Sequence, residues 1–199
     1  MATDYMKTGR VLKSGIATPK GRIIYPALFK PSLMKGETDE SKARFQVALL
    51  IPKDAVLAIL TQAVIDKVND KWSAAVVKTS KIKKPFIRTE DDPKWMEYAD
   101  EFPVMIRTNS KERPGVVMAN LKECTDETQV YGGRWAVLAL NPFAYDHPVG
   151  GKGVSWGLQH VQLLENDDPI GPGRIRAEDA FEAVSDEGGE PATADSIWG

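Results

Sequence analysis

Residues 44–51 read Arg-Phe-Gln-Val-Ala-Leu-Leu-Ile, and every second side chain in this stretch is apolar. The residues that would share one face of an extended chain are Phe45, Val47, Leu49 and Ile51. An alternation of period two is typical of a β-strand with one buried face. Pro52 follows at once and predicts the end of the strand, because proline has no N–H to donate to a ladder. The stretch therefore predicts a strand that packs against a core.

Segments on both sides of this strand are also predicted to be extended. Residues 11–17 and 22–29 are predicted as strands separated by a Thr-Pro-Lys-Gly turn, and residues 104–108 as a short strand. Residues 135–140 and 154–164 are predicted as two further strands. The residues between the last two include several turn formers and predict a hairpin loop: Asp146, Pro148, Gly150 and Gly151.

One amphipathic helix is predicted after the strand at 44–51. Asp54 is a suitable N-cap, and the helical pattern continues to about Asn69. The apolar residues at helical spacing that would face a core are Leu57, Leu60, Val64 and Val68. The strands, this helix and long loop insertions predict a mainly β fold, an OB-fold-like barrel of about five to six strands.

Composition narrows the classes of function. The chain has 199 residues, one cysteine (Cys124) and two histidines, too few for a zinc site with four Cys/His ligands. It has no nucleotide-binding loop, no nucleophile elbow and no apolar run long enough to span a membrane. We therefore predict a protein that is not an enzyme, needs no cofactor and has no membrane partner.

Charge divides the chain into a predicted binding domain, residues 1–176, and an acidic, disordered tail, residues 177–199. The tail has no Lys or Arg and carries −7, so the remainder carries +5 to give the formal net charge of −2. A basic body with an acidic tail is typical of proteins that bind polyanions. The tail residues predicted to mask the basic body or to bind a partner are Glu178, Asp179, Glu182, Asp186, Glu187, Glu190, Asp195, Ile197 and Trp198.

Basic and aromatic residues are interleaved along the body. Binding of a single strand without sequence preference needs cations along the phosphates and flat side chains that stack on the bases. The predicted phosphate-binding residues are Lys83, Lys84, Arg88, Arg107, Lys111, Arg134 and Lys152. The predicted stacking residues are Tyr25, Phe86, Tyr131, Trp135, Phe143, Tyr145 and Trp156.

Each of these assignments has a purely structural alternative. The basic run at residues 78–88 could be an ordinary solvated loop. Trp135 and Trp156 stand in apolar strands, so core packing and base stacking are equally favoured for both. Gly132 and Gly133 could simply permit a bulge or turn before a strand.

Several blocks along the body carry a resemblance to a known family. They are residues 24–31 (IYPALFKP), 45–53 (FQVALLIPK), 109–110 (NS), 113–117 (RPGVV), 130–135 (VYGGRW), 150–162 (GGKGVSWGLQHVQ) and 167–171 (DDPIG). In this order and spacing the sequence resembles the tailed-phage OB-fold single-stranded-DNA-binding proteins, formerly a phage family of unknown function. The resemblance implies an OB-type barrel, non-sequence-specific binding of single-stranded DNA and a role in phage DNA replication, recombination or repair.

The resemblance also implies partners and a location. Single-stranded DNA is the expected partner, with phage or host replication proteins recruited through the acidic tail, in the cytoplasm of the infected bacterial host. Trp198 is followed by Gly199, whereas an aromatic residue commonly ends the tail of replication single-strand binders. The sequence leaves open whether the protein forms a homo-oligomer.

Two other functions stay open from the residues alone. One is a structural or scaffold protein of a phage, a β-domain with a charged tail. The other is a magnesium-dependent nuclease, for which Glu90, Asp91 and Asp92 supply candidate carboxylates.

Overall fold

The computed structural model describes residues 5–33 and 35–171 of the chain. Its strands are β1 (Arg10–Val11), β2 (Ile16–Ala17), β3 (Gly21–Ser32), β4 (Arg44–Ile51), β5 (Ile87–Arg88), β6 (Val104–Ser110), β7 (Gly115–Val117), β8 (Trp135–His147) and β9 (Gly151–Leu163). Its α-helices are α1 (Tyr5–Thr8), α2 (Ala58–Lys71) and α3 (Ala74–Thr79). Short 3-10 turns are η1 (Glu40–Lys42), η2 (Thr89–Asp91), η3 (Met96–Tyr98) and η4 (Glu127–Gln129). The predicted tail, including its acidic residues and Trp198, lies outside the described residues.

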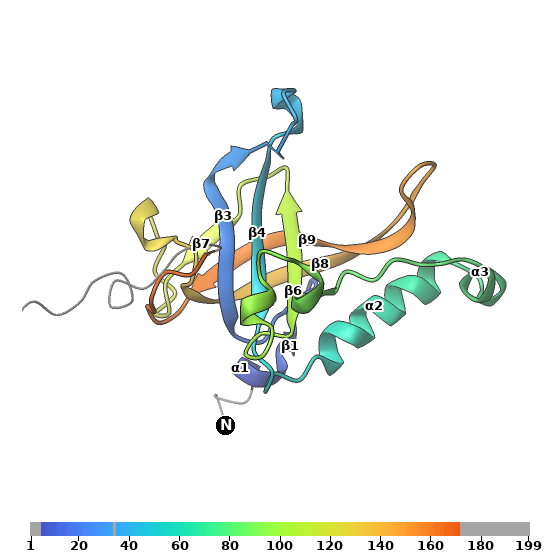
Figure 1. The fold of residues 1–199 in the computed structure, drawn as a ribbon, viewed down its shortest axis with the longest axis horizontal. Helices are drawn as coiled ribbons and strands as arrows, with labels where there is room; N and C mark the ends of the chain where they lie inside the picture. The colour runs from blue at the N-terminus through green and yellow to red at the C-terminus, as the bar shows by residue number, and fades with distance from the viewer. Residues whose placement is uncertain (1–4, 34, 172–199) are drawn as a thin grey trace, which may run out of the picture.

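Five long strands close into a barrel. β3 pairs with β4, β4 with β6, β6 with β9, β9 with β8, and β8 again with β3. All of these pairings are antiparallel except β6–β9, which is parallel. Such a closed circuit of five strands is the OB-type barrel that the sequence predicts, and β1, β2, β5 and β7 extend it at the edges (Figure 1).

The interior of the barrel confirms the alternation read from residues 44–51. Val47, Leu49 and Ile51 are buried in the main core cluster, together with Ile23, Ile106 and Leu138 from neighbouring strands. Interior side chains of adjacent strands fill a barrel of this size completely.

The outer face of β3, β4 and β6 is buried over only part of its area. Ala48 and Leu50 of β4 point away from the barrel interior and form a second cluster with Trp95 and Phe102. The segment between β5 and β6, which contains η2 and η3, supplies these two aromatic residues and lies in front of the sheet in Figure 1. The rest of this outer face is therefore not covered by the η2–η3 segment.

The predicted helix is present but starts later than expected. α2 begins at Ala58, after Leu57 as its N-cap, so the prediction of Asp54 as the cap was wrong. Asp54 instead pairs with Lys7 at 2.9 Å. Leu60 and Val64 are buried in the main core, as the helical spacing predicts, and α2 contacts β8 and β9.

The hairpin of β8 and β9 is much longer than the sequence predicts. The two strands pair as far as His147 and Gly151, with one register shift between Ala139 and Leu140, so the loop holds only residues 148–150. Their outer part forms an arm that projects beyond the barrel (Figure 1). Residues 141–147 include Pro142 and look irregular alone; pairing with β9 holds them extended.

Other differences lie at the edges of the barrel. The strand predicted at residues 11–17 is a pair of two-residue strands, β1 and β2, that pair with each other around a turn. The short elements β5, β7 and α3 were not predicted, because segments of this length carry almost no periodicity. Among the described residues, no helix is both long and apolar enough to cross a membrane.

Candidate nucleic-acid interface

The exposed part of the β3–β4–β6 face forms a groove of about 460 Å³. Its lining comes from three strands, from the loop after β3 and from the η2–η3 segment: Tyr25, Leu33, Lys35, Gln46, Val47, Ala48, Asp92, Lys94, Arg107, Thr108 and Asn109. This is the face of an OB barrel on which oligonucleotides bind. The groove brings together two of the predicted site residues, Tyr25 and Arg107, and adds two lysines.

Tyr25 owes its position to a β-bulge. Ile24 pairs with Ala48 and Ala27 with Gln46, so Tyr25 and Pro26 together oppose only Val47. Tyr25 has a φ of 51°, in the left-handed region, which costs a residue with a side chain about 1–2 kcal/mol. Its side chain is 45% exposed in the groove. Bulges re-aim side chains next to functional sites, and this one directs an aromatic ring outward from the sheet.

Side chains of the η2–η3 segment hold both groove residues. The indole N–H of Trp95 donates to the Tyr25 hydroxyl at 2.9 Å, and the two rings meet edge to face at 5.5 Å. The Arg107 guanidinium donates to Asp92 at 2.9 Å and is still largely exposed. The groove therefore presents an aromatic ring and an oriented cation side by side.

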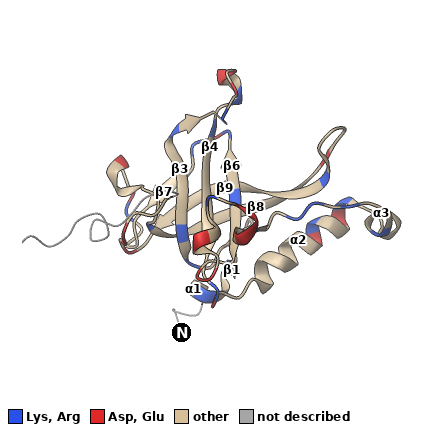
Figure 2. Cartoon of the chain, viewed as in Figure 1, with Lys and Arg blue, Asp and Glu red and all other residues tan. Residues whose placement is uncertain are grey.

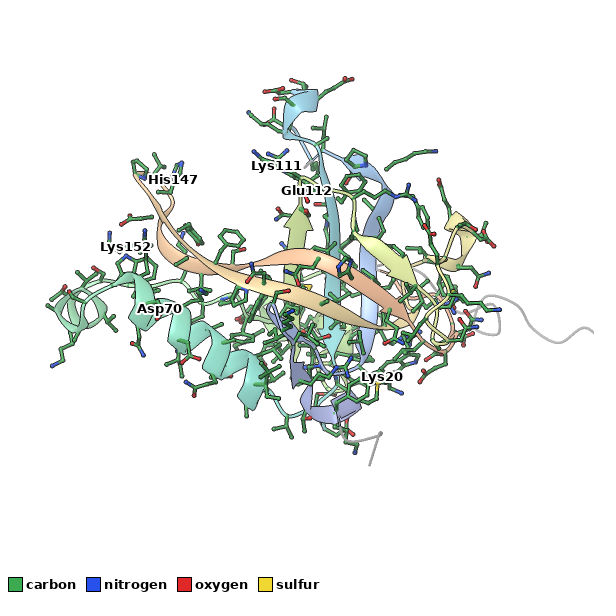
Figure 3. All side chains as sticks on the ribbon, turned by 180° about the vertical axis from the view of Figure 1, so that it is seen from behind. Lys20, Asp70, Lys111, Glu112, His147 and Lys152 are labelled. Atoms are coloured by element: carbon green, nitrogen blue, oxygen red, sulfur yellow. The ribbon has the colours of Figure 1, made fainter. Side chains whose placement is uncertain are left out.

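More cations lie where the arm leaves the barrel. β9 runs beside β6, with Trp156 opposite Thr108, and residues 81–86 cross to β9 next to this point. Lys83 and Lys84 are exposed there, and Figure 2 shows Lys and Arg along the segment that returns from α3. Figure 3 places Lys111 at the end of β6, and it too is exposed.

Two other predicted phosphate-binding residues already have acidic partners. Lys152, on the arm in Figure 3, lies 2.5 Å from Asp146. Arg88 pairs with Glu90 and Asp91. Their net positive charge toward a phosphate is correspondingly smaller.

The arm carries two of the predicted aromatics, and a third, Phe86, lies in the segment between α3 and β5. Phe143 is 45% exposed, and Tyr145 is half-buried over Gly153. Phe86, also half-buried, packs edge to face on Trp156 at 6.0 Å.

Trp156 must be corrected from a stacking residue to a core residue. Its side chain is fully buried in the main core, and its indole N–H donates to the Pro85 carbonyl at 3.1 Å. It belongs to the same core cluster as Leu49, Ile106 and Leu138, so its ring faces the barrel interior. A base cannot reach it without opening the barrel.

Arg134 must be corrected in the same way. It is 3% exposed, and its guanidinium donates to the Gln129 side chain at 2.7 Å and to the Leu164 carbonyl at 2.9 Å. These bonds tie the segment before β8 to the end of β9. The positive charge of Arg134 is thus used inside the protein, where a phosphate cannot approach.

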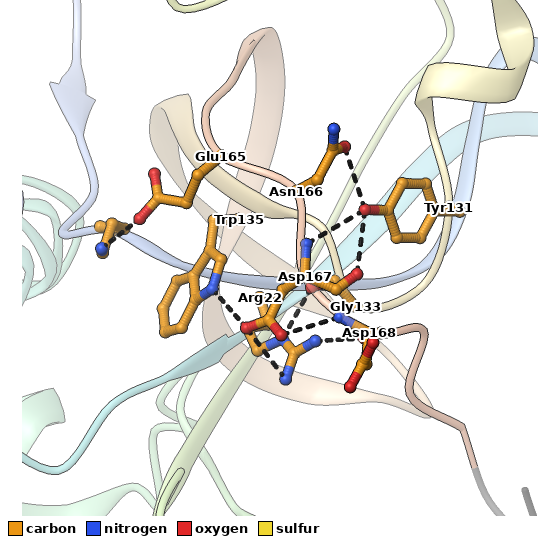
Figure 4. A network of polar contacts seen from close by, with 9 residues as sticks. Arg22, Tyr131, Gly133, Trp135, Glu165, Asn166, Asp167 and Asp168 are labelled. Atoms are coloured by element: carbon orange, nitrogen blue, oxygen red, sulfur yellow. Dashed lines mark hydrogen bonds and ion pairs between the residues drawn. The ribbon is translucent and has the colours of Figure 1, made fainter. Parts of the chain in front are cut away.

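Trp135 and Tyr131 belong to a polar network (Figure 4), and neither residue lines the groove. The Trp135 indole N–H donates to Asp167 at 2.7 Å, and Lys20 lies 4.6 Å from the centre of the Trp135 ring. The Tyr131 hydroxyl lies within 3.2 Å of the backbone N–H of Asp167, from which it accepts a bond. Both side chains fasten the residues after β9 to the barrel.

Arg22 is the centre of this network and was not predicted. It is 7% exposed, donates to the Gly133 carbonyl at 2.6 Å and to the Asp168 carbonyl, and lies 3.5 Å from the Asp167 carboxylate. In sequence it is one basic residue of a strand, and nothing nearby indicates partners that lie more than 100 positions away.

Gly133 has a specific role in the same network. Its φ is 111°, and a Cβ there would lie 2.6 Å from the Asp168 carbonyl oxygen. The glycine therefore permits residues 168–170 to lie directly on the turn before β8, where the Ile170 N–H bonds to the Gly132 carbonyl.

Glu165 extends the network to Lys20, 2.5 Å away. Partial burial acts to raise the pKa of Glu165, but its hydrogen bond to Lys20 and the charge of Lys20 together hold that pKa below the usual value. The contact therefore stabilises the fold at neutral pH, and its contribution is lost only as the pH falls through the lowered pKa.

We expect Tyr131→Phe to lower the free energy of unfolding by about 1 kcal/mol, because the change deletes the hydroxyl that binds residues 166 and 167. Affinity for oligo(dT) should stay at the wild-type value, since Tyr131 lies outside the groove lining. Urea denaturation and an oligo(dT) titration measure the two effects. Wild-type stability of the variant would show that the hydroxyl does not fasten this segment.

Lys35 and Lys94 are groove residues that the sequence did not single out. Lys94 falls in the irregular stretch between α2 and β6, and Lys35 in the loop after β3. Lys94 directly precedes Trp95, but neither lysine lies in a basic run, and only the folded chain brings them to Tyr25 and Arg107.

Known proteins resemble this chain in sequence or in structure. A putative protein, p50, from Acyrthosiphon pisum secondary endosymbiont phage 1 is 24% identical over 173 residues, which are 82% of this chain and 90% of that protein. The solved structure of the single-stranded DNA-binding protein from bacteriophage Enc34 is 25% identical, with a TM-score of 0.62 over 88% of this chain and 95% of that one. The structure of the same phage protein in complex with single-stranded DNA has a TM-score of 0.61 at 24% identity, over 83% of this chain and 94% of that one.

The match extends to a whole family. The family described as Enterobacter phage Enc34, ssDNA-binding protein, matches residues 14–191, a range that holds the barrel, the groove and the arm. The resemblance read from the sequence blocks is thereby confirmed. The chain belongs to the Enc34 family of phage single-stranded-DNA-binding proteins.

Proposed function

We propose that this protein binds single-stranded DNA without sequence preference, through the β3–β4–β6 groove and the adjoining base of the arm. The observation that carries the proposal is that the outward ring of Tyr25 and the exposed guanidinium of Arg107 line the same groove. Bases stack on rings and phosphates bind cations, and neither contact depends on which base is present.

The remaining cations lie in the groove itself and beside the neighbouring strand, β9. Lys35 and Lys94 line the groove, and Lys83 and Lys84 lie beside β9, the strand next to β6. A strand of DNA that leaves the groove across β6 would meet Lys83 and Lys84 next. In this proposal the protein acts in phage DNA replication, recombination or repair, in the cytoplasm of the infected host.

The nuclease alternative receives less support from the geometry. Its candidate carboxylates are used in ion pairs: Glu90 and Asp91 with Arg88, and Asp92 with Arg107. Among the described residues, no cluster of three or more His, Cys, Asp or Glu side chains is placed to hold a metal ion. Incubation of labelled DNA with the protein and magnesium checks this point, and we expect the DNA to remain intact.

The test of the proposed site is Tyr25→Ala. Removing one stacking surface should weaken oligo(dT) binding by about 5- to 150-fold, the equivalent of 1–3 kcal/mol. A fluorescence-anisotropy titration with labelled oligo(dT) measures the loss. Tyr5→Ala is the matched control, an aromatic on α1 outside the groove, and it should bind like the wild type.

Two results would contradict the proposal. One is wild-type affinity in a folded Tyr25→Ala variant, which would remove Tyr25 from the site. The other is equal affinity of the wild-type protein for oligo(dT) and for a duplex of the same length, since duplex bases are not free to stack.

The acidic tail is part of the proposal on charge alone. Its seven acidic residues and lack of basic ones suit a segment that competes with DNA for the cationic body or recruits replication proteins. Truncation after Arg176 should then tighten oligo(dT) binding at low salt.

A further inference from the structure

Trp95 has an unusual combination of burial and outward bonding. It is 1% exposed and packed in the outer core cluster with Phe102, Leu50 and Met105. It does not line the groove, yet its indole N–H reaches the Tyr25 hydroxyl at 2.9 Å. A buried residue thus holds the tip of a side chain that is 45% exposed.

The contact restrains the Tyr25 ring in more than one direction. The hydrogen bond fixes the phenol tip, and the ring planes are 85° apart, so the Tyr25 ring lies edge to face with the indole. Trp95 is itself held from behind by the Tyr98 ring, 5.5 Å away. The support is therefore rigid, because each partner is packed against the next.

Such restraint favours binding for a simple reason. A free tyrosine side chain on a surface samples several rotamers and loses that freedom when a base stacks on it. A ring that is already held in one orientation has little freedom left to lose, so the complex is more stable by that amount. The bulge at Tyr25 restrains the backbone of the same residue.

We infer that Trp95 is a positioning residue for single-strand binding, and that its indole N–H holds the Tyr25 ring ready to stack on a base. The inference rests on the proposed function of the groove. Trp95 touches no DNA in this scheme and acts only through Tyr25, from a position 70 residues away in sequence.

The test uses both ends of the bond. Trp95→Phe keeps an aromatic ring in the cluster and deletes the donor, whereas Tyr25→Phe keeps the ring in the groove and deletes the acceptor. Each should weaken oligo(dT) binding by about 2- to 12-fold, the range expected for one lost hydrogen bond. The double variant Tyr25→Phe/Trp95→Phe should be no weaker than the weaker single variant, because both remove the same bond.

A second cycle separates positioning from a general loss of stability. Trp95→Phe should change nothing in a Tyr25→Ala background, since no ring is left to hold. Trp72→Phe is the matched control, a buried tryptophan of the main core outside the groove lining. It should reduce stability in urea while leaving oligo(dT) affinity unchanged.

The possible results distinguish a failure of this inference from a failure of the proposed function. Loss of binding in Tyr25→Ala with wild-type binding in Trp95→Phe and Tyr25→Phe overturns this inference and leaves the proposed function in place. Multiplicative losses in either double variant also overturn it. Failure of the wild type to bind oligo(dT) overturns the proposed function itself. If Trp95→Phe does not fold, Tyr25→Phe alone decides.

Discussion

Raising the salt concentration tenfold should weaken oligo(dT) binding by about 600-fold. The expectation comes from four exposed lysines in the groove and at the base of the arm, Lys35, Lys83, Lys84 and Lys94; Arg107 is left out because Asp92 already pairs with it. If each lysine neutralises one phosphate, the logarithm of affinity should fall against the logarithm of salt with a slope of about −2.8, because each contact on a single strand contributes about −0.7. Anisotropy titrations at several salt concentrations give the slope directly.

Single charge removals assign this slope to the groove. Lys94→Gln should make the slope shallower by about 0.7. Lys122→Gln is the control, because Lys122 lies in the loop after β7 and does not line the groove. A slope near zero in the wild type, or an equal change in both variants, would contradict the assignment of the groove as the phosphate-binding surface.

Trp156→Ala should lower the free energy of unfolding by about 3–5 kcal/mol, the usual cost of deleting a large buried aromatic. The change leaves a cavity among the core residues of β8 and β9 and removes the partner of the Pro85 carbonyl. This loss is a large part of the stability of an ordinary domain, about 5–15 kcal/mol. Urea denaturation of the two proteins measures it.

The control for this variant is Phe143→Ala on the outer arm. Phe143 is 45% exposed, so its removal should change stability by no more than about 0.5 kcal/mol. Unchanged stability in Trp156→Ala together with weakened DNA binding would return Trp156 to the stacking surface, against its burial.

The sequence predicted the class of fold because barrel strands carry their own signal. Residues 44–51 alternate, and Val47, Leu49 and Ile51 fill the barrel interior as expected, whereas Phe45 is only half-buried and lies outside the core cluster. α2 was predicted from its apolar spacing, but the predicted start was too early. Asp54, the expected N-cap, pairs with Lys7, and the helix begins at Ala58. Short elements such as β5 and β7 form by pairing with neighbouring strands. Their own residues carry no local pattern that predicts a strand.

The sequence predicted the kind of chemistry at the site better than it predicted which residues form the site. Interleaved cations and aromatics indicated a single-strand binder, and Tyr25 and Arg107 do meet in the groove. A tryptophan in an apolar strand has the same pattern whether it faces the core or the solvent, so Trp156 could not be assigned. Arg134 could not be assigned either, because its burial depends on the Leu164 carbonyl, which lies 30 residues further along the chain.

By itself, then, the sequence determined that this chain forms a β-barrel with a basic body. Periodicity and charge are local properties, so they can be read directly from the order of the residues. Only the tertiary structure decided which rings and cations share a surface. That decision depends on a bulge at Tyr25, on the η2–η3 segment laid across the sheet and on pairing between distant strands. Each of these brings together residues far apart in the chain, and such contacts leave no pattern in a single sequence.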